Sequence, residues 1–169
     1  MRLREAFAGL LPRLREAALA CYGQNLVTLA VFGSVARGTP GPDSDIDLLL
    51  ICRELPEGRV RRMAGFACVE QALARDLERL EGAGIHTSLS PVFKTVAEAQ
   101  AGSHLYLDMV EEAILLHDEG RFFESVLNTL KERLEKLGAR RVRQGSRWYW
   151  VLKPDLEPGE VIDLWPPAR

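Results

Sequence analysis

The sequence predicts an α/β (α+β) fold in which a small mixed β-sheet is backed by helices and followed by a C-terminal helix and β-hairpin extension. Three observations support this fold class. The runs "NLVTLAVFG" and "DIDLLLIC" have the length and apolar character of buried strands. Longer segments around them repeat apolar residues at steps of three or four, as helices with one buried side do. Near the C-terminus, Gly145-Ser146 separates two strand-like runs, as in a two-residue hairpin turn.

The length of 169 residues is enough for a single domain with a sizeable core. We therefore expect one compact unit, with a core over residues 1–100 and an extension over residues 101–169 that packs on it. Apolar residues make up 47% and charged residues 27% of the sequence, as in ordinary globular proteins. The formal net charge of −2 argues against a protein that coats nucleic acid, while a local basic patch is still compatible with it.

The cysteines and the N-terminus bear on the compartment. Cys21, Cys52 and Cys68 are odd in number and far apart, so they suggest neither a disulfide framework nor a zinc site, and a reducing cytosol is the simplest interpretation. Residues 1–23 mix Arg and Glu with apolar residues and lack the uninterrupted apolar stretch of a signal peptide or a membrane span. The sequence therefore predicts a cytoplasmic protein without a membrane partner.

The first elements follow from local patterns, in chain order. The segment up to Tyr22 favours an amphipathic helix, which Pro12 starts, kinks or divides and Gly23 ends. "NLVTLAVFG" and "DIDLLLIC" then read as two central strands, the second of them apolar on both faces beyond its first residues. The helical period predicts a helix between Gly58 and Glu81.

The later elements are inferred in the same way. "GIHTSLSPVFKT" is a third strand candidate, and Pro91 places it near a sheet edge or bend. "VAEAQAG" predicts a short helix, residues 103–120 predict one longer helix, and residues 122–137 predict a further one. The longer helix carries three acidic residues at helical spacing that we expect to form a solvated face, Asp108, Glu111 and Glu112. The proline-rich residues 154–169 predict an irregular end, packed on the body or left loose.

Two aspartates, Asp45 and Asp47, stand at the start of the most apolar strand. Residues two apart in a strand point to the same face, so the two carboxylates lie side by side while Ile46 points into the other layer. Two such charges about 5 Å apart repel by roughly 3 kcal/mol at an effective dielectric constant near 20. Mg²⁺ binds one or two carboxylates together with substrate phosphates, which would offset this repulsion. The spacing therefore predicts a divalent-cation site.

Gly33 and Ser34 supply a matching anion site after the first strand. A glycine there lets the backbone approach a ligand closely, and the amides of the following turn form a partly positive nest for phosphate oxygens. The Ser34 hydroxyl adds a donor. Arg37, one helical turn further on, either contacts the same anion or stays an exposed helical arginine. The loop "GTPGPDS" then brings the two aspartates back beside the nest.

Residues 32–51, "FGSVARGTPGPDSDIDLLLI", resemble the signature of the minimal nucleotidyltransferases of the DNA polymerase β superfamily. In that family a strand, a Gly-Ser turn, a helix and a second strand with Asp-x-Asp form the active site. The resemblance implies a nucleoside triphosphate, with ATP among the candidates, bound at Gly33 and Ser34. It also implies two Mg²⁺ ions, with Mn²⁺ as an alternative, held by the catalytic Asp45 and Asp47.

The reaction implied by this resemblance is the transfer of a nucleoside monophosphate to an acceptor hydroxyl by a two-metal mechanism, with release of pyrophosphate. The acceptor would be a protein or a small molecule. In the family pattern a third carboxylate on the next strand completes the site, but "GIHTSLSPVFK" contains no Asp or Glu. This departure leaves the metal that activates the acceptor weakly specified. Candidate substitutes for the base are His86, Glu98 and Asp108.

Two other functions remain open at this point. A weakly active or non-catalytic, nucleotide-binding antitoxin-like protein would dock to a small helical toxin-like partner, and the missing third acid favours it. A nucleic-acid-binding module would use the hairpin aromatics Trp148, Tyr149 and Trp150, which lie among arginines. We prefer to interpret the hairpin as structural, with alternate aromatics packed inward. The sequence does not specify the nucleotide, the acceptor, or whether the chain forms a homo-oligomer.

Overall fold

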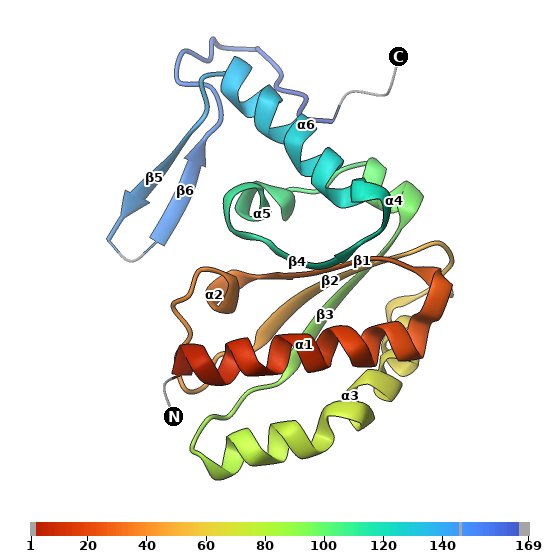
Figure 1. The fold of residues 1–169 in the computed structure, drawn as a ribbon. Helices are drawn as coiled ribbons and strands as arrows, with labels where there is room; N and C mark the ends of the chain where they lie inside the picture. Colours follow the sequence, from red (N-terminus) through yellow and green to blue (C-terminus); the bar gives the residue numbers. More distant parts are fainter. Residues whose placement is uncertain (1–2, 146, 166–169) are drawn as a thin grey trace.

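The computed structural model describes residues 3–145 and 147–165, and its centre is a four-stranded sheet (Figure 1). Strand β1 is antiparallel to β2 and β4, whereas β2 and β3 run parallel, so the sheet is mixed as predicted. The strand order is β3-β2-β1-β4, which places β1 and β2 in the centre. The strands are β1 (Leu26–Phe32), β2 (Ile46–Cys52), β3 (Leu89–Thr95) and β4 (Ile114–Asp118).

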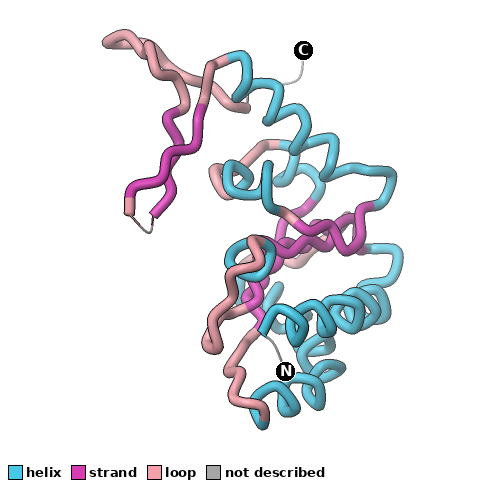
Figure 2. Tube along the Cα trace, turned by 60° about the vertical axis from the view of Figure 1, so that its left-hand side comes forward, coloured by secondary structure: helices cyan, strands magenta, loops and turns pink. Residues whose placement is uncertain are grey.

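Helices cover both faces of this sheet (Figure 1). Helices α1 and α3 lie on one face, and α5 and α6 lie on the other, from which a separate hairpin of β5 and β6 projects (Figures 1 and 2). The remaining bounds are α1 (Leu3–Tyr22), η1 (Gly23–Asn25), α2 (Gly33–Ala36), α3 (Arg59–Gly82), α4 (Val96–Gln100), α5 (Tyr106–Glu112), η2 (Glu119–Arg121), α6 (Phe122–Lys136), β5 (Arg140–Gln144) and β6 (Arg147–Val151).

Strand β2 contributes to two separate apolar cores. Leu48 and Leu50 are buried with the apolar sides of α1 and α3. Leu49 and Ile51 point to the other face and are buried with residues of α5 and α6. This alternation is what a strand covered on both faces requires, and it confirms that β2 is apolar on both sides beyond its first residues.

Several local predictions are confirmed. Helix α1 ends at Tyr22, and Gly23 follows with φ of +53°, a conformation that glycine adopts at little cost. Pro12 lies inside α1 and neither starts nor divides it. Pro91 lies in β3, an edge strand, where a missing backbone N–H is tolerated.

The prediction of one long helix over residues 103–120 is wrong. Helix α5 ends at Glu112, and residues 114–118 form β4, which pairs with β1. The run "ILLHD" continues the apolar pattern of the helix, so periodicity alone could not distinguish the two states. Strand pairing decides between helix and strand here. Without β4, the backbone N–H and C=O groups of β1 on the side away from β2 would lack hydrogen-bond partners. The core sheet thus takes one strand from the segment that follows residue 100.

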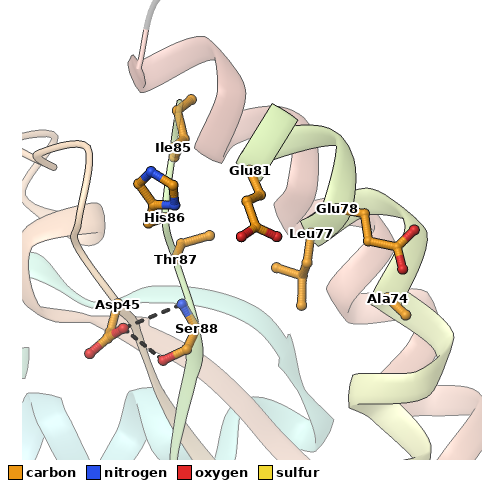
Figure 3. A pocket seen from close by; sticks show the side chains of 9 residues that line it. All are labelled: Asp45, Ala74, Leu77, Glu78, Glu81, Ile85, His86, Thr87 and Ser88. Carbon is orange, nitrogen blue, oxygen red and sulfur yellow. Dashed lines mark hydrogen bonds between the residues drawn. The ribbon is translucent and has the colours of Figure 1, made fainter. Parts of the chain in front are cut away.

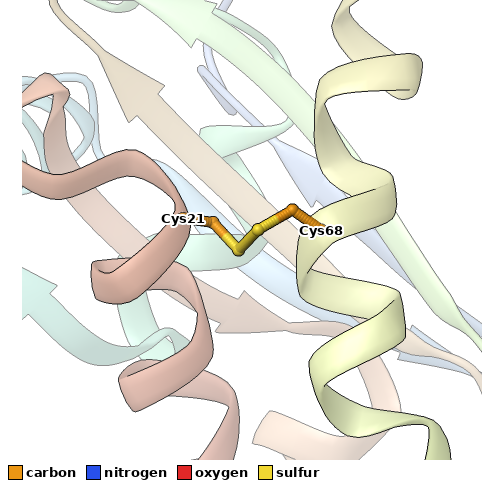
Figure 4. The surroundings of a disulfide bond; sticks show 2 residues. All are labelled: Cys21 and Cys68. Carbon is orange, nitrogen blue, oxygen red and sulfur yellow. A yellow bond between two sulfur atoms is a disulfide. The ribbon is translucent and has the colours of Figure 1, made fainter.

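A second correction concerns the cysteines. The prediction of no disulfide is wrong, since Cys21 and Cys68 are joined, with Cα atoms 6.1 Å apart (Figure 4). Helices α1 and α3 pack side by side and bring together two residues separated by 47 positions in the sequence. The third cysteine, Cys52, is a free thiol in the core of β2, and burial raises its pKa to about 11. Its thiol is therefore protonated and unreactive at neutral pH.

The C-terminal part agrees in outline with the sequence prediction. Gln144 pairs with Arg147 across the predicted hairpin turn, of which Ser146 lies outside the described residues. Trp150 packs against the α5 and α6 core, as expected for a structural hairpin. The expectation of alternate aromatics packed inward is wrong for Trp148, which is 49% exposed, and Tyr149 is 45% exposed. The following irregular segment is anchored on the body through buried Leu164. None of the helices within residues 3–145 and 147–165 is long and apolar enough to cross a membrane.

Candidate active site

The two predicted metal ligands lie at the start of β2. Asp47 is the second residue of the strand, and its backbone pairs with Phe32 of β1 and Ser90 of β3. Ile46 is fully buried in the core under α1 and α3, as predicted. Because side chains alternate along a strand, Asp47 shares the opposite face with Leu49, the face that α5 and α6 cover.

Asp45 is positioned by the chain that leads into β3. The Ser88 amide and hydroxyl both donate to Asp45 Oδ1, at 3.3 Å and 2.7 Å (Figure 3). The Ile46 amide donates to the Ser88 carbonyl oxygen in turn, which ties the two segments together. These bonds hold the exposed carboxylate of Asp45, whose charge is close enough to raise the pKa of Asp47. The sequence did not predict this contact of Ser88, because only the parallel register of β2 and β3 makes Ser88 a neighbour of Asp45.

Gly33 makes the closest approach in the site. It follows Phe32, the partner of Asp47, and begins the single turn of α2 with φ of +71°. A Cβ atom built on Gly33 would lie 2.1 Å from Asp47 Oδ2, closer than real Cβ contacts allow. The absence of a side chain at Gly33 therefore lets the turn rest directly on the Asp47 carboxylate. Ser34 is the next residue of the same turn, so the structure brings the predicted anion and cation sites together.

Arg37 ends the α2 turn but has a protein partner that the sequence did not predict. Its Nη1 lies 3.3 Å from Oε2 of Glu112 on α5. Glu112 also accepts a hydrogen bond from Arg141 of β5 and is only 16% exposed. The prediction of a solvated acidic face is therefore wrong for Glu112, because α5 turns it toward α2 and the hairpin. Asp108 and Glu111 are exposed, as predicted.

The charge at Asp47 is unfavourable in this setting. Burial raises the pKa of the Asp47 carboxyl, the neighbouring charge of Asp45 raises it further, and Arg37 opposes both effects. A bound cation would remove this strain, since it favours the ionised form of both carboxylates. Two carboxylates also match the donor set of Mg²⁺, which keeps several waters and takes the remaining oxygens from phosphates. Within the described residues, no group of three or more acidic, histidine or cysteine side chains could hold a metal alone.

The structure separates the three candidate bases. Glu98 lies beyond the C-terminal end of β3, whereas Asp47 lies at the N-terminal end of the parallel strand β2. Glu98 and Asp47 are therefore at opposite ends of these two strands. The Glu98 carboxylate binds Arg62 at 2.8 Å and 2.9 Å, and this contact is the main reason that its pKa is lowered to about 2. Glu98 is therefore not placed to act as a base. Asp108 is on α5, 3.9 Å from Arg141.

His86 lies beside Asp45 in a cleft of about 460 Å³ between the end of α3 and the segment that enters β3 (Figure 3). Glu78 and Glu81 line the α3 side of this cleft, and Asp45 and Ser88 line the other. His86 is the candidate base that shares this cleft with Asp45.

A strand, a Gly-Ser turn and a second strand with paired aspartates, set in a mixed sheet, together define a minimal nucleotidyltransferase. A family profile described as "Nucleotidyltransferase domain" matches residues 11–100, which is more than half of the chain. The chain therefore belongs to this family and is a nucleotidyltransferase. The match begins within α1, ends with α4 and includes Gly33, Asp45 and Asp47.

Similar proteins include "Putative protein adenylyltransferase MJ1305" of Methanocaldococcus jannaschii, which is 26% identical over 129 residues, 75% of this chain and 82% of that protein. Among solved structures, a toxin-antitoxin with AMP-PNP is 15% identical, with a TM-score of 0.44, and the match covers 73% of this chain and 92% of that chain. A tri-AMPylated Shewanella oneidensis HEPN toxin in complex with MNT antitoxin is 13% identical, with a TM-score of 0.34, and the match covers 81% of this chain and 93% of that one.

Proposed function

We propose that this chain transfers AMP from ATP to a hydroxyl group of a protein, with a divalent cation held by Asp45 and Asp47. The observation that carries the proposal is the contact between Gly33 and Asp47. This contact supports the proposal because a turn of the kind that binds phosphate oxygens would lie beside carboxylates of the kind that bind Mg²⁺. The choice of ATP and of a protein acceptor is supported by the name of the M. jannaschii relative.

In the proposed reaction, the acceptor oxygen forms a bond to the α-phosphorus of ATP. The bond between the α-phosphorus and the oxygen that bridges the α- and β-phosphates breaks. Pyrophosphate leaves, and the acceptor loses its proton. Gly33 and Ser34 hold the triphosphate, and Arg37 exchanges Glu112 for a phosphate oxygen. When bound, Mg²⁺ supplies neutralisation of the charge on the attacking and leaving oxygens, with two ions in the complete site. His86, beside Asp45, receives the acceptor proton.

The experiment is a transfer assay with ATP labelled at the α-phosphate, Mg²⁺, and the chain itself and a protein extract of its source as acceptors. Label should appear on protein, and γ-labelled ATP should transfer none. Asp45→Asn and Asp47→Asn should abolish the signal, because each removes a metal ligand. Asp43→Asn is the matched control, since Asp43 is an exposed residue of the same loop, and it should retain activity.

A second candidate function is a weakly active or non-catalytic antitoxin-like protein that binds nucleotide and docks to a small helical partner. One observation favours it: the residue opposite Asp47 on β3 is Ser90, so that strand brings no third carboxylate to the site. ATP binding that depends on Asp47 without transfer of label would support this alternative. Loss of both binding and transfer in the wild-type protein would contradict both functions.

A further inference from the structure

A second cleft of about 680 Å³ opens between α2, α5 and the hairpin. One wall is formed by Ala36, the last residue of α2, with Arg37 and Thr39 after it, and Ala36 is three residues along the chain from Gly33 of the candidate phosphate site. Its opposite wall is Trp148, near the tip of the hairpin. Figures 1 and 2 both show the hairpin extending from the α6 side of the molecule. The full lining is Ala36, Arg37, Thr39, Glu111, Glu112, Arg143 and Trp148.

Trp148 faces this cleft because of the hairpin register. Residues paired directly across two antiparallel strands lie on the same face, and Arg143 pairs with Trp148 while Arg141 pairs with Trp150. Arg141 of that face contacts Glu112 of α5, so the face is turned toward α5. Tyr149 pairs with Val142 and lies on the opposite face of the hairpin.

The Trp148 ring is held in place by charged neighbours. The guanidinium carbons of Arg141 and Arg143 lie 4.9 Å and 5.6 Å from its ring centroid, within the range of cation–π attraction. Arg141 is only 11% exposed, and Glu112, which it contacts, also binds Arg37. These contacts connect the hairpin to the α2 turn. Trp148 is nevertheless 49% exposed, which leaves a large aromatic surface open to a ligand.

The distribution of charge indicates how a nucleotide would lie. Arg37, which ends the α2 turn, lines the cleft and suits phosphate. Glu111 lines the cleft as well and would repel phosphate, whereas its carboxylate, which lies 3.8 Å from Arg141 Nη1, can accept a hydrogen bond from an amino group. Arg143, the second arginine of the lining, lies against the Trp148 ring. A neutral, flat base with an exocyclic amino group is therefore the part of a nucleotide that this cleft fits. Aromatic side chains bind bases by stacking.

We propose that Trp148 is the base-stacking residue of the nucleotide site, and that Glu111 favours a base with an exocyclic amino group over uracil. The proposal rests on nucleotide binding at Gly33 and Asp47, as described in the proposed function. The triphosphate lies at the α2 turn, and the base stacks on the exposed face of Trp148.

The experiment compares Mg²⁺-dependent binding of ATP, UTP and inorganic tripolyphosphate by calorimetry. Trp148→Ala should weaken ATP binding roughly 5- to 150-fold, the range expected for the loss of one stacking contact. Tripolyphosphate, which has no base, should bind Trp148→Ala and wild type equally, and this also shows that the variant is folded. Trp148→Phe should retain most of the ATP affinity. Tyr149→Ala is the matched control and should bind ATP as wild type does. UTP should bind the wild type more weakly than ATP.

Four outcomes would overturn the proposal, and the last of them would overturn the proposed function as well. Equal weakening of ATP and tripolyphosphate binding in Trp148→Ala would show that Trp148 only supports the structure. Unchanged ATP binding in Trp148→Ala, with binding still dependent on Asp47, would refute base stacking and leave the proposed function intact. Salt-sensitive binding of a single-stranded oligonucleotide, lost in Trp148→Ala while ATP binding is unchanged, would assign the hairpin to nucleic acid instead. Failure of wild type to bind either ATP or tripolyphosphate would refute the proposed function itself.

Discussion

At the scale of single residues, the candidate site depends on one pair, Gly33 and Asp47. The glycine is needed for two independent reasons, its positive φ and the space that the carboxylate occupies. Asp47 is in turn destabilised as an anion by burial and by Asp45. A close approach combined with an unfavourable charge lowers stability, and such features concentrate at functional sites, which supports the proposed cation and phosphate site.

Gly33→Ala should disturb both the backbone conformation at residue 33 and the close approach to Asp47. The new methyl group would displace the Asp47 carboxylate, and the left-handed backbone would cost about 1–2 kcal/mol with a Cβ atom present. We expect a fall of that size in the free energy of unfolding and loss of transfer activity, measured by urea denaturation and by the labelled-ATP assay. Gly65→Ala, in helix α3, is the control, because its methyl group meets no atom within 4 Å in the described residues. A Gly33→Ala variant as stable and active as wild type would contradict the geometry of the turn.

Asp47→Asn should raise stability in the absence of metal while abolishing transfer. A folded-state pKa above the ordinary value means that Asp47 favours folding when protonated, and this contribution is lost as the pH rises through the raised pKa. At neutral pH the ionised carboxylate therefore destabilises the fold. The excess stability of the variant should appear in denaturation curves at pH 7 and shrink as the pH falls below the ordinary carboxyl range. Mg²⁺ should stabilise wild type more than the variant, and the absence of this difference would argue against a metal at Asp47.

At the scale of elements, α4 shows how an acidic residue that suggests catalysis from sequence can be structural. Thr95 and Glu98 form a capping box at the start of α4, in which each side chain accepts a hydrogen bond from the other residue's backbone amide. The same Glu98 carboxylate binds Arg62 of α3 at two positions. Glu98 thus connects β3, α4 and α3 at the C-terminal end of β3, whereas the candidate site lies at the N-terminal end of β2.

Glu98→Gln should lower stability by up to about 1 kcal/mol, the usual upper range for a partly exposed ion pair. It should leave transfer activity unchanged. The carboxyl pKa is lowered to about 2, so its contribution to stability is complete above the ordinary value near 4.5 and is lost as the pH falls toward 2. The difference between wild type and variant should therefore narrow in denaturation curves between pH 5 and about 2. Glu70→Gln on the exposed side of α3 is the control. A large loss of transfer in Glu98→Gln would restore Glu98 as a candidate base.

At the scale of the whole molecule, three layers hold the site: α1 with α3, the sheet, and α5 with α6 (Figure 1). The disulfide between Cys21 and Cys68 lies within the first layer and joins its two long helices. Disulfides are rare in the cytosol of mesophiles and common in intracellular proteins of hyperthermophiles. The bond therefore fits the predicted cytoplasmic location best in an organism of the second kind. The compartment stays a prediction.

Reduction of this disulfide should lower the free energy of unfolding by up to about 4 kcal/mol, as the chain-entropy model gives for a loop closed over 47 residues. Urea denaturation with and without a reductant measures the loss. The Cys21→Ser, Cys68→Ser double variant should be insensitive to reductant and equal to reduced wild type. Thiol titration of the unfolded, unreduced chain should find one thiol, that of Cys52. Three titratable thiols would show that the bond is absent from the protein as isolated.

The local sequence determined the segment over residues 32–51 and the elements around it, because each depends on neighbours in the chain. A strand ends at Gly33, a turn begins there, and Asp45 and Asp47 return at the start of a strand apolar on both faces. These features suffice to predict the family and the type of site. The functional roles of Gly33, Ser34, Arg37, Asp45 and Asp47 stay predictions until the variants are measured.

Only the tertiary structure decided the features that depend on segments far apart in the chain. Residues 114–118 form a strand because they pair with the backbone of β1, although their apolar pattern suits a helix equally well. Cys21 is bonded to Cys68 because α1 and α3 pack together. Glu112 contacts Arg37 because α5 lies next to α2. Periodicity describes which side of an element is buried, but not which other element buries it. For that physical reason the family could be predicted from the sequence, whereas the surroundings of the candidate site could not.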